Sequence, residues 1–425
     1  MTATQPGTPA TATPTTPTSQ GTATALRTWI ALLSMTTTSF VLVSAEFLPG
    51  GLLTSMAADL GVSPGLAGQA VTATAVAGFF GALFVGPLAP GLDRRRLLVA
   101  MAIAAAVSNA AVALAPSLPL LLVARLLLGA ALSGFWSMSL TVAASIVGAD
   151  RVGRGMMMVN AGTMLATVLG VPAGVLLAGW LDWRVVFALI SALTLLVAVG
   201  LRALLPSVPA EGIVGLAALG ETLRIRGMRP ALVGHVLVVF GQMAAYAFIR
   251  VALEKVPDLD GGGVATLLLV YGLGGFVGNL VLGWLADRML GVLSLAVPTA
   301  IAVAVTAVAL WPQMPVIVLA VALWGSAFGG WLVVLNTWVA HHVPDRLETG
   351  ASLSVAGFQL AIAAGAAVGG ILVDSAGITT TLLVAAAVAL IGGVLFWRAP
   401  ARYPATAAPT RCPADLAQEA TSCSV

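Results

Sequence analysis

Two charged side chains stand inside apolar segments of this sequence, where charge is costly. Glu46 lies within the first long apolar run and Arg125 within the fourth. Insertion scales assign about 2.5–3.5 kcal/mol to a charged residue at the centre of a membrane helix. A carboxylate there can bind and release a proton, and a guanidinium supplies a fixed positive charge. We therefore expect this pair to carry proton coupling.

Depth along the two segments favours a meeting of these side chains. At 1.5 Å per residue, Arg125 lies about 10 Å from the outer end of its segment, near Leu118, and Glu46 about 15 Å from the outer end of its own. A shared depth would offset part of the cost of burying both charges. The alternative is that Arg125 extends to the outer surface.

The composition identifies the setting as a membrane. Hydrophobic residues make up 59% of the chain and charged residues 8%, with a mean hydropathy of +1.04, whereas soluble domains carry about 25% charged residues. Segments of about 20 apolar residues are long enough to cross a bilayer as helices. We predict an all-α membrane protein with twelve transmembrane helices, at 28–57, 66–89, 97–115, 118–147, 155–179, 184–204, 230–253, 263–285, 290–310, 315–340, 351–373 and 378–397.

The longest polar interruption divides the chain into two sets of six helices. The predicted organisation is an N-terminal tail at 1–26, a six-helix bundle at 27–205, a central loop at 206–229, a second six-helix bundle at 230–398 and a C-terminal tail at 399–425. Both tails have the composition of disordered segments. Cys412 and Cys423 fall in the second tail, so the sequence predicts no disulfide framework and no metal site.

Charge predicts the orientation. With the N-terminus in the cytoplasm, nearly all arginines fall on the inner side, and only Arg184, Arg250 and the single lysine, Lys255, fall outside or near the outer rim. This distribution follows the positive-inside rule and places both termini in the cytoplasm of a multi-pass cell-membrane protein. The pI of about 9.3 is a consequence of this distribution and gives no reason to expect nucleic acid as a partner.

Several stretches, in their order and spacing, resemble the major facilitator superfamily. The chain is similar to its twelve-helix drug/proton antiporters, and within them to the sugar (arabinose-type) efflux permeases. The stretches are AEFLPGGLLTSMAADLGVS (45–63), LDRRRLL (92–98), ARLLLGAALSGFWS (124–137), TMLATVLGVPAG (163–174), DWRVVF (182–187), MAAYAFI (243–249) and TWVAHHVPD (337–345). The resemblance implies two pseudo-symmetric six-helix bundles related by an axis along the membrane normal.

A short motif that follows the second helix of each half resembles the family's gating loop. It reads GPLAPGLDRRR from Gly86 and GWLADR from Gly283. The family usually has an acid four residues after the glycine, where the first copy has a proline and the second has an aspartate. The resemblance implies a gate that closes the cytoplasmic side, although these arginines could also simply obey the positive-inside rule. The candidate gating residues are Gly86, Asp93, Arg94, Arg95, Asp287 and Arg288.

Helix five resembles the antiporter motif, which bends that helix and packs it closely. The family has Gly-Pro where this chain reads Val171-Pro172, a change also found in the sugar-efflux branch. The alternative is ordinary packing of small residues. The residues that match the motif are Gly162, Gly170, Pro172 and Gly174.

Polar and aromatic side chains at mid-membrane are the candidate substrate contacts. Gln242 and Tyr246 are four residues apart and therefore share one helix face. Interhelical hydrogen bonding is the alternative role for such residues. We read the three histidines, His235, His341 and His342, as interfacial. The candidate contacts are Trp136, Asn160, Gln242, Tyr246, Asn279, Asn336, Trp338 and Gln359.

No soluble-enzyme motif is present in the sequence. We find no phosphate-binding glycine-lysine loop, no GxSxG elbow and no metal-ligand cluster, so we expect a transporter that is neither an enzyme nor ATP-driven and has no cofactor. The expected function is proton-coupled efflux of a small neutral or weakly polar compound, such as a sugar, nucleoside or antibiotic, which would confer drug resistance. The alternatives are a symporter or facilitator that imports a small polar solute, and a non-transporting membrane protein such as a sensor or a lipid-modifying enzyme. The expected partners are the substrate, protons and lipid, and the expected state is a monomer.

Overall fold

The computed structural model describes residues 19–399 except 179, 211–214, 254, 258 and 260. Within that part of the chain every regular element is a helix, which confirms the predicted all-α class. The greater part of both predicted disordered tails, 1–18 and 400–425 with Cys412 and Cys423, lies outside the described residues.

One predicted boundary is wrong at the N-terminus. Helix α1 begins at Ser19, so residues 19–26, predicted as tail, are helical. α1 is helical from the first described residue onward, because extending an existing helix fixes only one residue for each hydrogen bond gained.

The first half of the chain forms one bundle. Its helices are α1 (Ser19–Asp59), α2 (Pro64–Leu88), α3 (Arg94–Ala113), α4 (Leu118–Val147), α5 (Val152–Leu165), α6 (Val171–Ala178) and α7 (Trp183–Leu204), with a π-helix, η2 (Ala166–Gly170), between α5 and α6. Local sequence fixes several of these starts. Ser63 caps α2 and is followed by Pro64, and the carboxylates of Asp93 and Asp182 cap α3 and α7.

Helix five of the prediction is the interrupted element α5–η2–α6. Its glycines allow α1 to approach closely: a Cβ atom at Gly162 would overlap the Thr36 carbonyl oxygen, and one at Gly170 would overlap the Ser44 hydroxyl. A Cβ at Gly174 would overlap the Leu48 side chain. Pro172 lies in α6, the first turn after the π-helix. π-Helical turns of this kind occur mostly inside α-helices and often at functional sites.

The second half forms the other bundle. Its elements are α8 (Leu216–Arg224), α9 (Met228–Tyr246), α10 (Ile249–Leu253), α11 (Gly261–Leu310), α12 (Met314–His342) and α13 (Leu347–Arg398). The predicted central loop at 206–229 is thus partly helical, because α8 lies within it. Glu221 and Thr222 of α8 bond to Arg346 and Thr349 at the start of α13, which ties α8 to the second bundle.

Two helices of the second bundle are too long for a single crossing. α11 has 50 residues and α13 has 52, about 75 Å at 1.5 Å per residue, against a hydrocarbon core of about 30 Å. Each contains a non-helical residue where the chain turns, Met289 in α11 and Gly377 (φ 80) in α13. We therefore count α11 and α13 as two membrane crossings each. The interrupted elements α5–η2–α6 and α9–α10 count as one crossing each. With α1, α2, α3, α4, α7 and α12, we infer twelve crossings within the described residues.

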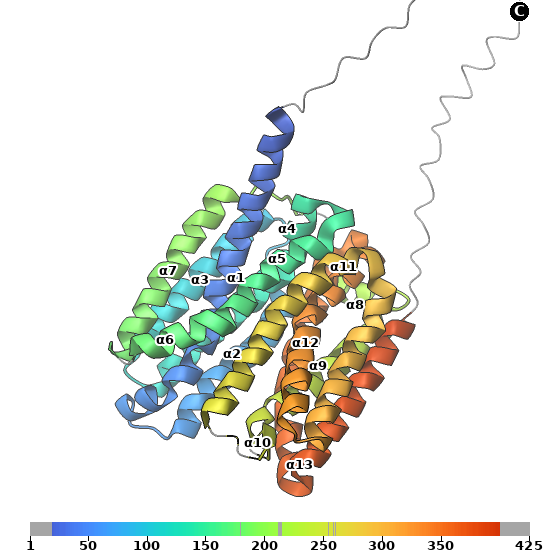
Figure 1. Ribbon diagram of the computed structural model, residues 1–425. Coiled ribbons are helices and arrows are strands. Elements are labelled where there is room, and N and C mark those ends of the chain that lie inside the picture. Colours follow the sequence, from blue (N-terminus) through green and yellow to red (C-terminus); the bar gives the residue numbers. More distant parts are fainter. Residues whose placement is uncertain are drawn as a thin grey trace, which may run out of the picture.

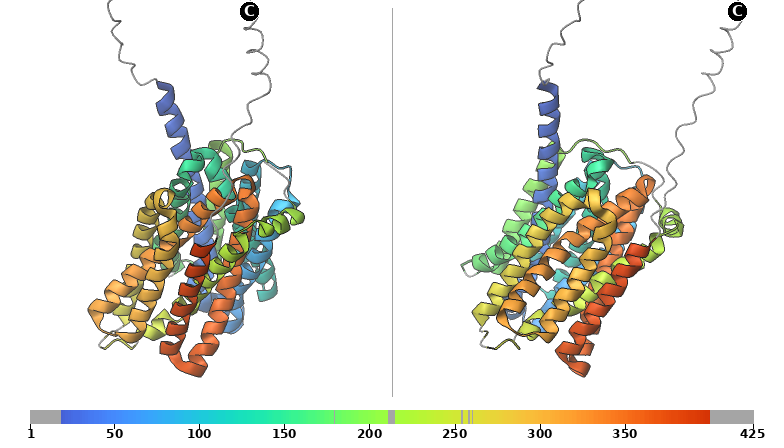
Figure 2. Two further views of the ribbon diagram at one scale, coloured as in Figure 1. Left: turned by 90° about the vertical axis from the view of Figure 1, so that its right-hand side faces the viewer. Right: turned by 45° about the vertical axis from the view of Figure 1, so that its right-hand side comes forward.

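The two bundles lie side by side (Figure 1), with α1–α7 in blue to green and α9–α13 in yellow-green to red. Two apolar clusters belong to the first bundle alone. The third fills the second bundle and includes Leu140, Ala143, Val152 and Met156 of the first, so the bundles share a core near the starts of α5 and α13. We call the end of the molecule that carries Arg94–Arg96, Arg151 and Arg346 the arginine-rich side; α8 lies there (Figure 2).

Candidate functional site

Glu46 lies in α1 just before Pro49, within an apolar stretch long enough to cross a membrane. Its side chain is partly exposed, whereas the neighbouring Ala45 and Leu48 are buried. A carboxylate in this position is reachable by a proton yet surrounded by apolar side chains. It can therefore serve as a titratable group within the membrane span.

Arg125 of α4 meets α1 at the residue next to Glu46. The Arg125 side chain is 0% exposed, so it does not extend to the surface. Its Nη1 donates a hydrogen bond of 3.0 Å to the Ala45 carbonyl oxygen, and its guanidinium carbon lies 5.2 Å from the centre of the Phe187 ring. These contacts fix the guanidinium at the depth of the carboxylate.

Glu46 and Arg125 attract each other electrostatically, although Nη1 of Arg125 donates its hydrogen bond to a backbone carbonyl instead of this carboxylate. Within the described residues, Nε and Nη2 of Arg125 have no hydrogen-bond partner. Buried unpaired donors of this kind are costly. They are able to hold the Glu46 carboxylate, a water molecule or a ligand oxygen if the helices shift.

A second buried charge pair joins the two bundles on the arginine-rich side. The Nε atom of Arg94, at the start of α3, lies 2.7 Å from Oε2 of Glu348, at the start of α13, and their side chains are 0% and 8% exposed. Arg94 Nη1 also donates to the carbonyl oxygens of Ala89 and Leu92. Sequence reasoning selected Arg94 but missed Glu348.

Asp287 of α11 makes the other polar tie on this side. Its Oδ1 accepts a hydrogen bond of 2.8 Å from the backbone N–H of Gly153 in the first turn of α5, a helix with no side-chain cap of its own. The second bundle thus supplies the negative charge that the N-terminus of α5 favours. Nearby, Asn279 donates to the Met157 carbonyl oxygen at 2.8 Å.

Three predicted gating residues stay within their own bundle. Asp93 caps α3 and accepts a hydrogen bond from Ser207, Arg95 donates to the Leu205 carbonyl oxygen, and Arg288 stacks on the Trp284 ring at 4.8 Å. Gly86 is buried in the last turn of α2. Helix capping uses the acid of the first loop, and this explains why Asp93 does not reach across the boundary.

Burial would raise the pKa of Asp93. Hydrogen bonds from Ser207 and from the backbone N–H groups of Arg95 and Arg96, together with the positive charge of Arg95, outweigh this effect. The pKa of Asp93 is therefore lowered from its ordinary value of 3.8. Asp93 is therefore a fixed negative charge at neutral pH.

An aromatic cluster with one amide lies in the second bundle and contains Gln242, Tyr246, Tyr271 and Trp324. Trp324 Nε1 donates to Gln242 Oε1 at 2.5 Å, and Gln242 Nε2 donates to the Tyr271 hydroxyl at 2.7 Å. The two tyrosine rings are 4.7 Å apart. Sequence reasoning selected Gln242 and Tyr246 by their spacing but missed the other two, which look like ordinary aromatic residues of apolar helices.

The remaining candidate contacts differ in their surroundings. Asn160 is 1% exposed, and neither of its amide atoms has a partner within the described residues. Trp136 and Asn336 are partly exposed, and Gln359 is buried against Gly78 of the first bundle. Trp338 stacks on His342 at 4.2 Å and packs on Phe396 inside the second bundle, which removes it from the candidate pathway.

His235, predicted to be interfacial from its place near one end of its helix, has a buried ring. Its ring is 0% exposed and lies parallel to Trp331 and Phe358. The Trp331 indole N–H donates to Nδ1 of His235, so the ring proton resides on Nε2, which donates to the Ser354 carbonyl oxygen. A complete set of hydrogen-bond partners lets an imidazole lie deep in the bundle.

Comparison with known proteins now identifies the fold family. The family model described as Major Facilitator Superfamily matches residues 30–347 and 231–416. The chain belongs to the Major Facilitator Superfamily. It is 34% identical over 376 residues to the transcription regulatory protein OpdE of Pseudomonas aeruginosa, a match that covers 86% of this chain and 92% of that protein.

A second group of relatives is named for transport. The chain is 31% identical over 368 residues to the purine ribonucleoside efflux pump NepI of Salmonella paratyphi B, covering 86% of this chain and 91% of the relative. Among solved structures, the human organic anion transporter MFSD10 (TETRAN) has a TM-score of 0.72 at 17% identity, covering 88% of this chain and 99% of that chain. The proton:xylose symporter XylE has a TM-score of 0.71 at 16% identity, covering 89% and 97%. These structures share the fold.

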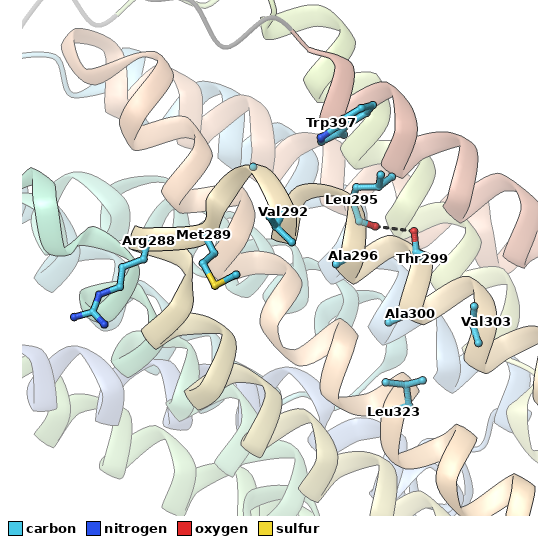
Figure 3. Close-up of a pocket in the computed structure, with 11 residues that line it drawn as sticks. Arg288, Met289, Val292, Leu295, Ala296, Thr299, Ala300, Val303, Leu323 and Trp397 are labelled. Atoms are coloured by element: carbon cyan, nitrogen blue, oxygen red, sulfur yellow. Dashed lines mark hydrogen bonds between the residues drawn. The ribbon is translucent and has the colours of Figure 1, made fainter.

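An apolar groove lies on the second bundle. A groove of about 810 Å³ is formed by the second arm of α11, by Leu323 of α12 and by Trp397 of α13. Its walls are apolar and exposed, and the Arg288 side chain points away from it (Figure 3). Its lining offers few polar groups that could orient a ligand, so we do not assign substrate to this groove.

Proposed function

We propose that this protein is a proton-coupled secondary transporter that exports a small neutral or weakly polar compound by alternating access. The observation that carries the proposal is the placement of Glu46 and Arg125 together inside an apolar span. Charged residues are retained within membrane segments chiefly where they serve substrate or proton pathways. The name of the relative NepI makes nucleosides one candidate substrate class, beside sugars and antibiotics.

The orientation follows from charge. We assign the arginine-rich side to the cytoplasm of the cell membrane by the positive-inside rule. The cross-bundle ties of Arg94 with Glu348 and of Asp287 with Gly153 lie on that side. With these ties intact the cytoplasmic side is closed. Export requires that these ties break, so that substrate can enter from the cytoplasm. The ties must form again before the substrate is released on the outside.

Glu46 is the proposed proton carrier in this cycle. A guanidinium keeps its proton at any working pH, so Arg125 is a fixed charge that favours the ionised carboxylate. When a proton from the outside neutralises Glu46, its attraction to Arg125 is lost and the balance between the two conformations changes. Release of the proton into the cytoplasm then restores the pair, which couples inward proton flow to outward substrate flow.

The decisive experiment compares Glu46→Gln with the parent protein in proteoliposomes. Substrates are first selected by binding from a panel of nucleosides, sugars and amphenicol-type antibiotics, and uphill transport driven by a pH gradient is then measured. We expect Glu46→Gln to bind substrate but to lose uphill transport. Glu221→Gln is the matched control, because Glu221 is an exposed carboxylate on α8. Full uphill transport by Glu46→Gln would exclude this coupling site.

Variants of Arg125 test the second member of the pair. Arg125→Lys keeps the charge but loses the planar fork, so partial coupling should survive. Arg125→Ala leaves Glu46 without its positive neighbour, and transport should lose its dependence on the pH gradient. The measurement is gradient-driven efflux beside a control for expression and folding. Fully coupled transport by Arg125→Ala would mean that this arginine only stabilises the contact of α4 with α1.

Import remains the alternative direction. Inside-out and right-side-out vesicles that contain the protein distinguish export from import, because only one orientation accumulates substrate when the gradient is applied. The relative OpdE is named as a regulatory protein. A protein that binds a compound from the panel but moves none in either vesicle type would fit a sensor and would contradict the transporter proposal.

A further inference from the structure

The aromatic cluster defined above has two buried members and two partly exposed members. Gln242 and Trp324 are 0% exposed, whereas Tyr246 and Tyr271 are partly exposed. The Trp324 ring is perpendicular to both tyrosine rings, with centroid distances of 6.3 Å and 5.6 Å. The buried pair therefore acts as a rigid support behind two accessible phenol rings.

The hydrogen bonds of the support have a fixed direction. An indole N–H can only donate, so the Gln242 oxygen must face Trp324 and its amide nitrogen must face Tyr271. The Tyr271 oxygen is consequently an acceptor, which leaves the Tyr271 proton to be donated elsewhere. Within the described residues, neither tyrosine hydroxyl donates to a protein acceptor. The cluster thus presents two phenol donors and two aromatic rings, and it carries no formal charge.

The cluster lies where the helices are irregular and the bundles meet. α9 ends at Tyr246, and two residues outside any helix precede α10. Gly272, next to Tyr271, would bring a Cβ atom within 3.2 Å of Val168 in the π-helix η2 of the other bundle. Interrupted membrane helices are tolerated where they are enclosed by protein or line a cavity. Tyr271 and Gly272 of α11 thus lie between the break after Tyr246 and the π-helix of the other bundle.

The same register places Glu46 close in depth. α5–η2–α6 runs beside α1 with Gly170 against Ser44 and Gly174 against Leu48. Val168, which faces Gly272, is therefore level with about residue 42 of α1. Glu46 is one helical turn further along, about 6 Å in depth at 1.5 Å per residue. A ligand on the tyrosines would lie at nearly the depth of the proton site.

We propose that Tyr246 and Tyr271 bind the planar nitrogen heterocycle of a substrate such as a nucleoside. A flat π-system stacks on a phenol ring, and its ring nitrogens or carbonyl oxygens accept the two hydroxyl protons. A free sugar lacks the π-face, and a dedicated cation would require a carboxylate in the cluster. This inference rests on the proposed transport function and assigns a substrate class to it.

Equilibrium binding to the purified full chain, without any gradient, tests the site. The probes are adenosine, guanosine and uridine, with ribose and arabinose as ring-free comparisons. We expect at least one nucleoside to bind about tenfold or more tightly than either sugar, the range that base–aromatic stacking supplies. Nucleosides that bind no more tightly than ribose would overturn the proposal.

Three tyrosine variants separate the ring from the hydroxyl. Tyr246→Leu removes a ring and should weaken nucleoside binding about tenfold or more, whereas Tyr271→Phe keeps the ring and should weaken it about fivefold. The matched control is Tyr403→Phe, which changes the third tyrosine of the chain and should leave the affinity unchanged. Thermal unfolding identifies a misfolded variant, and Tyr271→Phe, which changes one atom, keeps the test valid if Tyr246→Leu does not fold. Parental affinity in both folded variants would overturn the site.

The two proposals fail in different ways. Uphill transport of another compound, together with no preferential nucleoside binding, would overturn the heterocycle site and leave proton coupling intact. Tyrosine-dependent nucleoside binding without gradient-driven movement would support the site and contradict the transport mechanism.

Discussion

The two bundles each contain one copy of the loop with glycine, aspartate and arginine, and the copies reach across the boundary with opposite charges. In the first bundle the arginine reaches the other bundle, because Arg94 pairs with Glu348. Asp93 stays within the first bundle as the cap of α3. In the second bundle the acid crosses: Asp287 accepts from Gly153. Arg288 remains outside the boundary, exposed and stacked on its own helix.

The difference follows from where the preceding helix ends. α2 ends at Leu88, two residues before Pro90, which cannot donate a helical hydrogen bond. A loop therefore follows α2, and Asp93, the next acidic residue, lies where it caps α3. α11 instead continues past Asp287 to the kink at Met289, so its acid remains on a helix that faces the other bundle. One repeated motif can therefore perform the same task with either charge, provided that the partner bundle supplies the complement.

Among the variants that test this comparison, Glu348→Ala should open the arginine-rich side the most. It leaves Arg94 buried without a partner, and breaking a buried pair costs about 3–5 kcal/mol. Because the lost pair joins the bundles, we expect the arginine-rich side to open. The measurement is labelling of Thr337→Cys, a buried position of α12 beside Gly153, in a chain whose Cys412 and Cys423 are replaced by serine. The rate should rise more than about tenfold.

The controls for this change use a second ion pair and a charge reversal. Glu221→Ala removes the exposed partner of Arg346, and exposed pairs contribute little, so labelling should stay at the parental rate. The double variant Arg94→Glu with Glu348→Arg should recover part of the closure. Parental labelling in Glu348→Ala itself would show that this pair does not hold the side closed.

Asp287→Ala should open the same side to a smaller extent. The variant loses one charged hydrogen bond to the backbone, worth about 1.5–3 kcal/mol, and removes the negative charge at the start of α5. Asp287→Asn should have a weaker effect, since its amide oxygen still accepts from Gly153. Arg288→Ala is the matched control, because Arg288 is exposed and stacks on Trp284 of its own helix. Equal labelling for the alanine variants of Asp287 and Arg288 would remove the distinction between the two copies.

Hydropathy and helix-length arguments are sufficient to predict the fold class, because the bilayer permits few alternatives to apolar helices. Counting residues along two helices also indicates that Glu46 and Arg125 share a depth, and the structure places them in adjacent positions. The partner of Arg94 could not be found in this way. Glu348 is one of several polar residues after a turn, and only the ion pair that forms where the starts of α3 and α13 meet distinguishes it.

The aromatic cluster, too, could be predicted only in part from the sequence. Spacing selects Gln242 and Tyr246 because they lie on one helix, but Tyr271 and Trp324 belong to two other helices. Their distinctive feature is a chain of hydrogen bonds through Gln242, and such a chain exists only after three helices have packed. The helix-five motif predicts a bend in that helix, but η2 has no proline or charged residue that would indicate a π-helix.

Asp93→Ala should have the smallest effect of the series and should act on stability without opening the gate. Loss of a helix cap costs about 1 kcal/mol, and Asp93 ties α3 only to its own bundle. Its pKa is lowered below the ordinary 3.8, so its stabilising contribution is complete above pH 3.8 and is lost as the pH falls through the lowered value. The stability difference between parent and variant, measured by thermal unfolding, should therefore be constant near neutrality and shrink below pH 3.8. Labelling at Thr337→Cys should stay parental at pH 7. A variant that opened the arginine-rich side as Asp287→Ala does would mean that the acids of both copies act across the boundary, and that the division of charges between the loops is not functional.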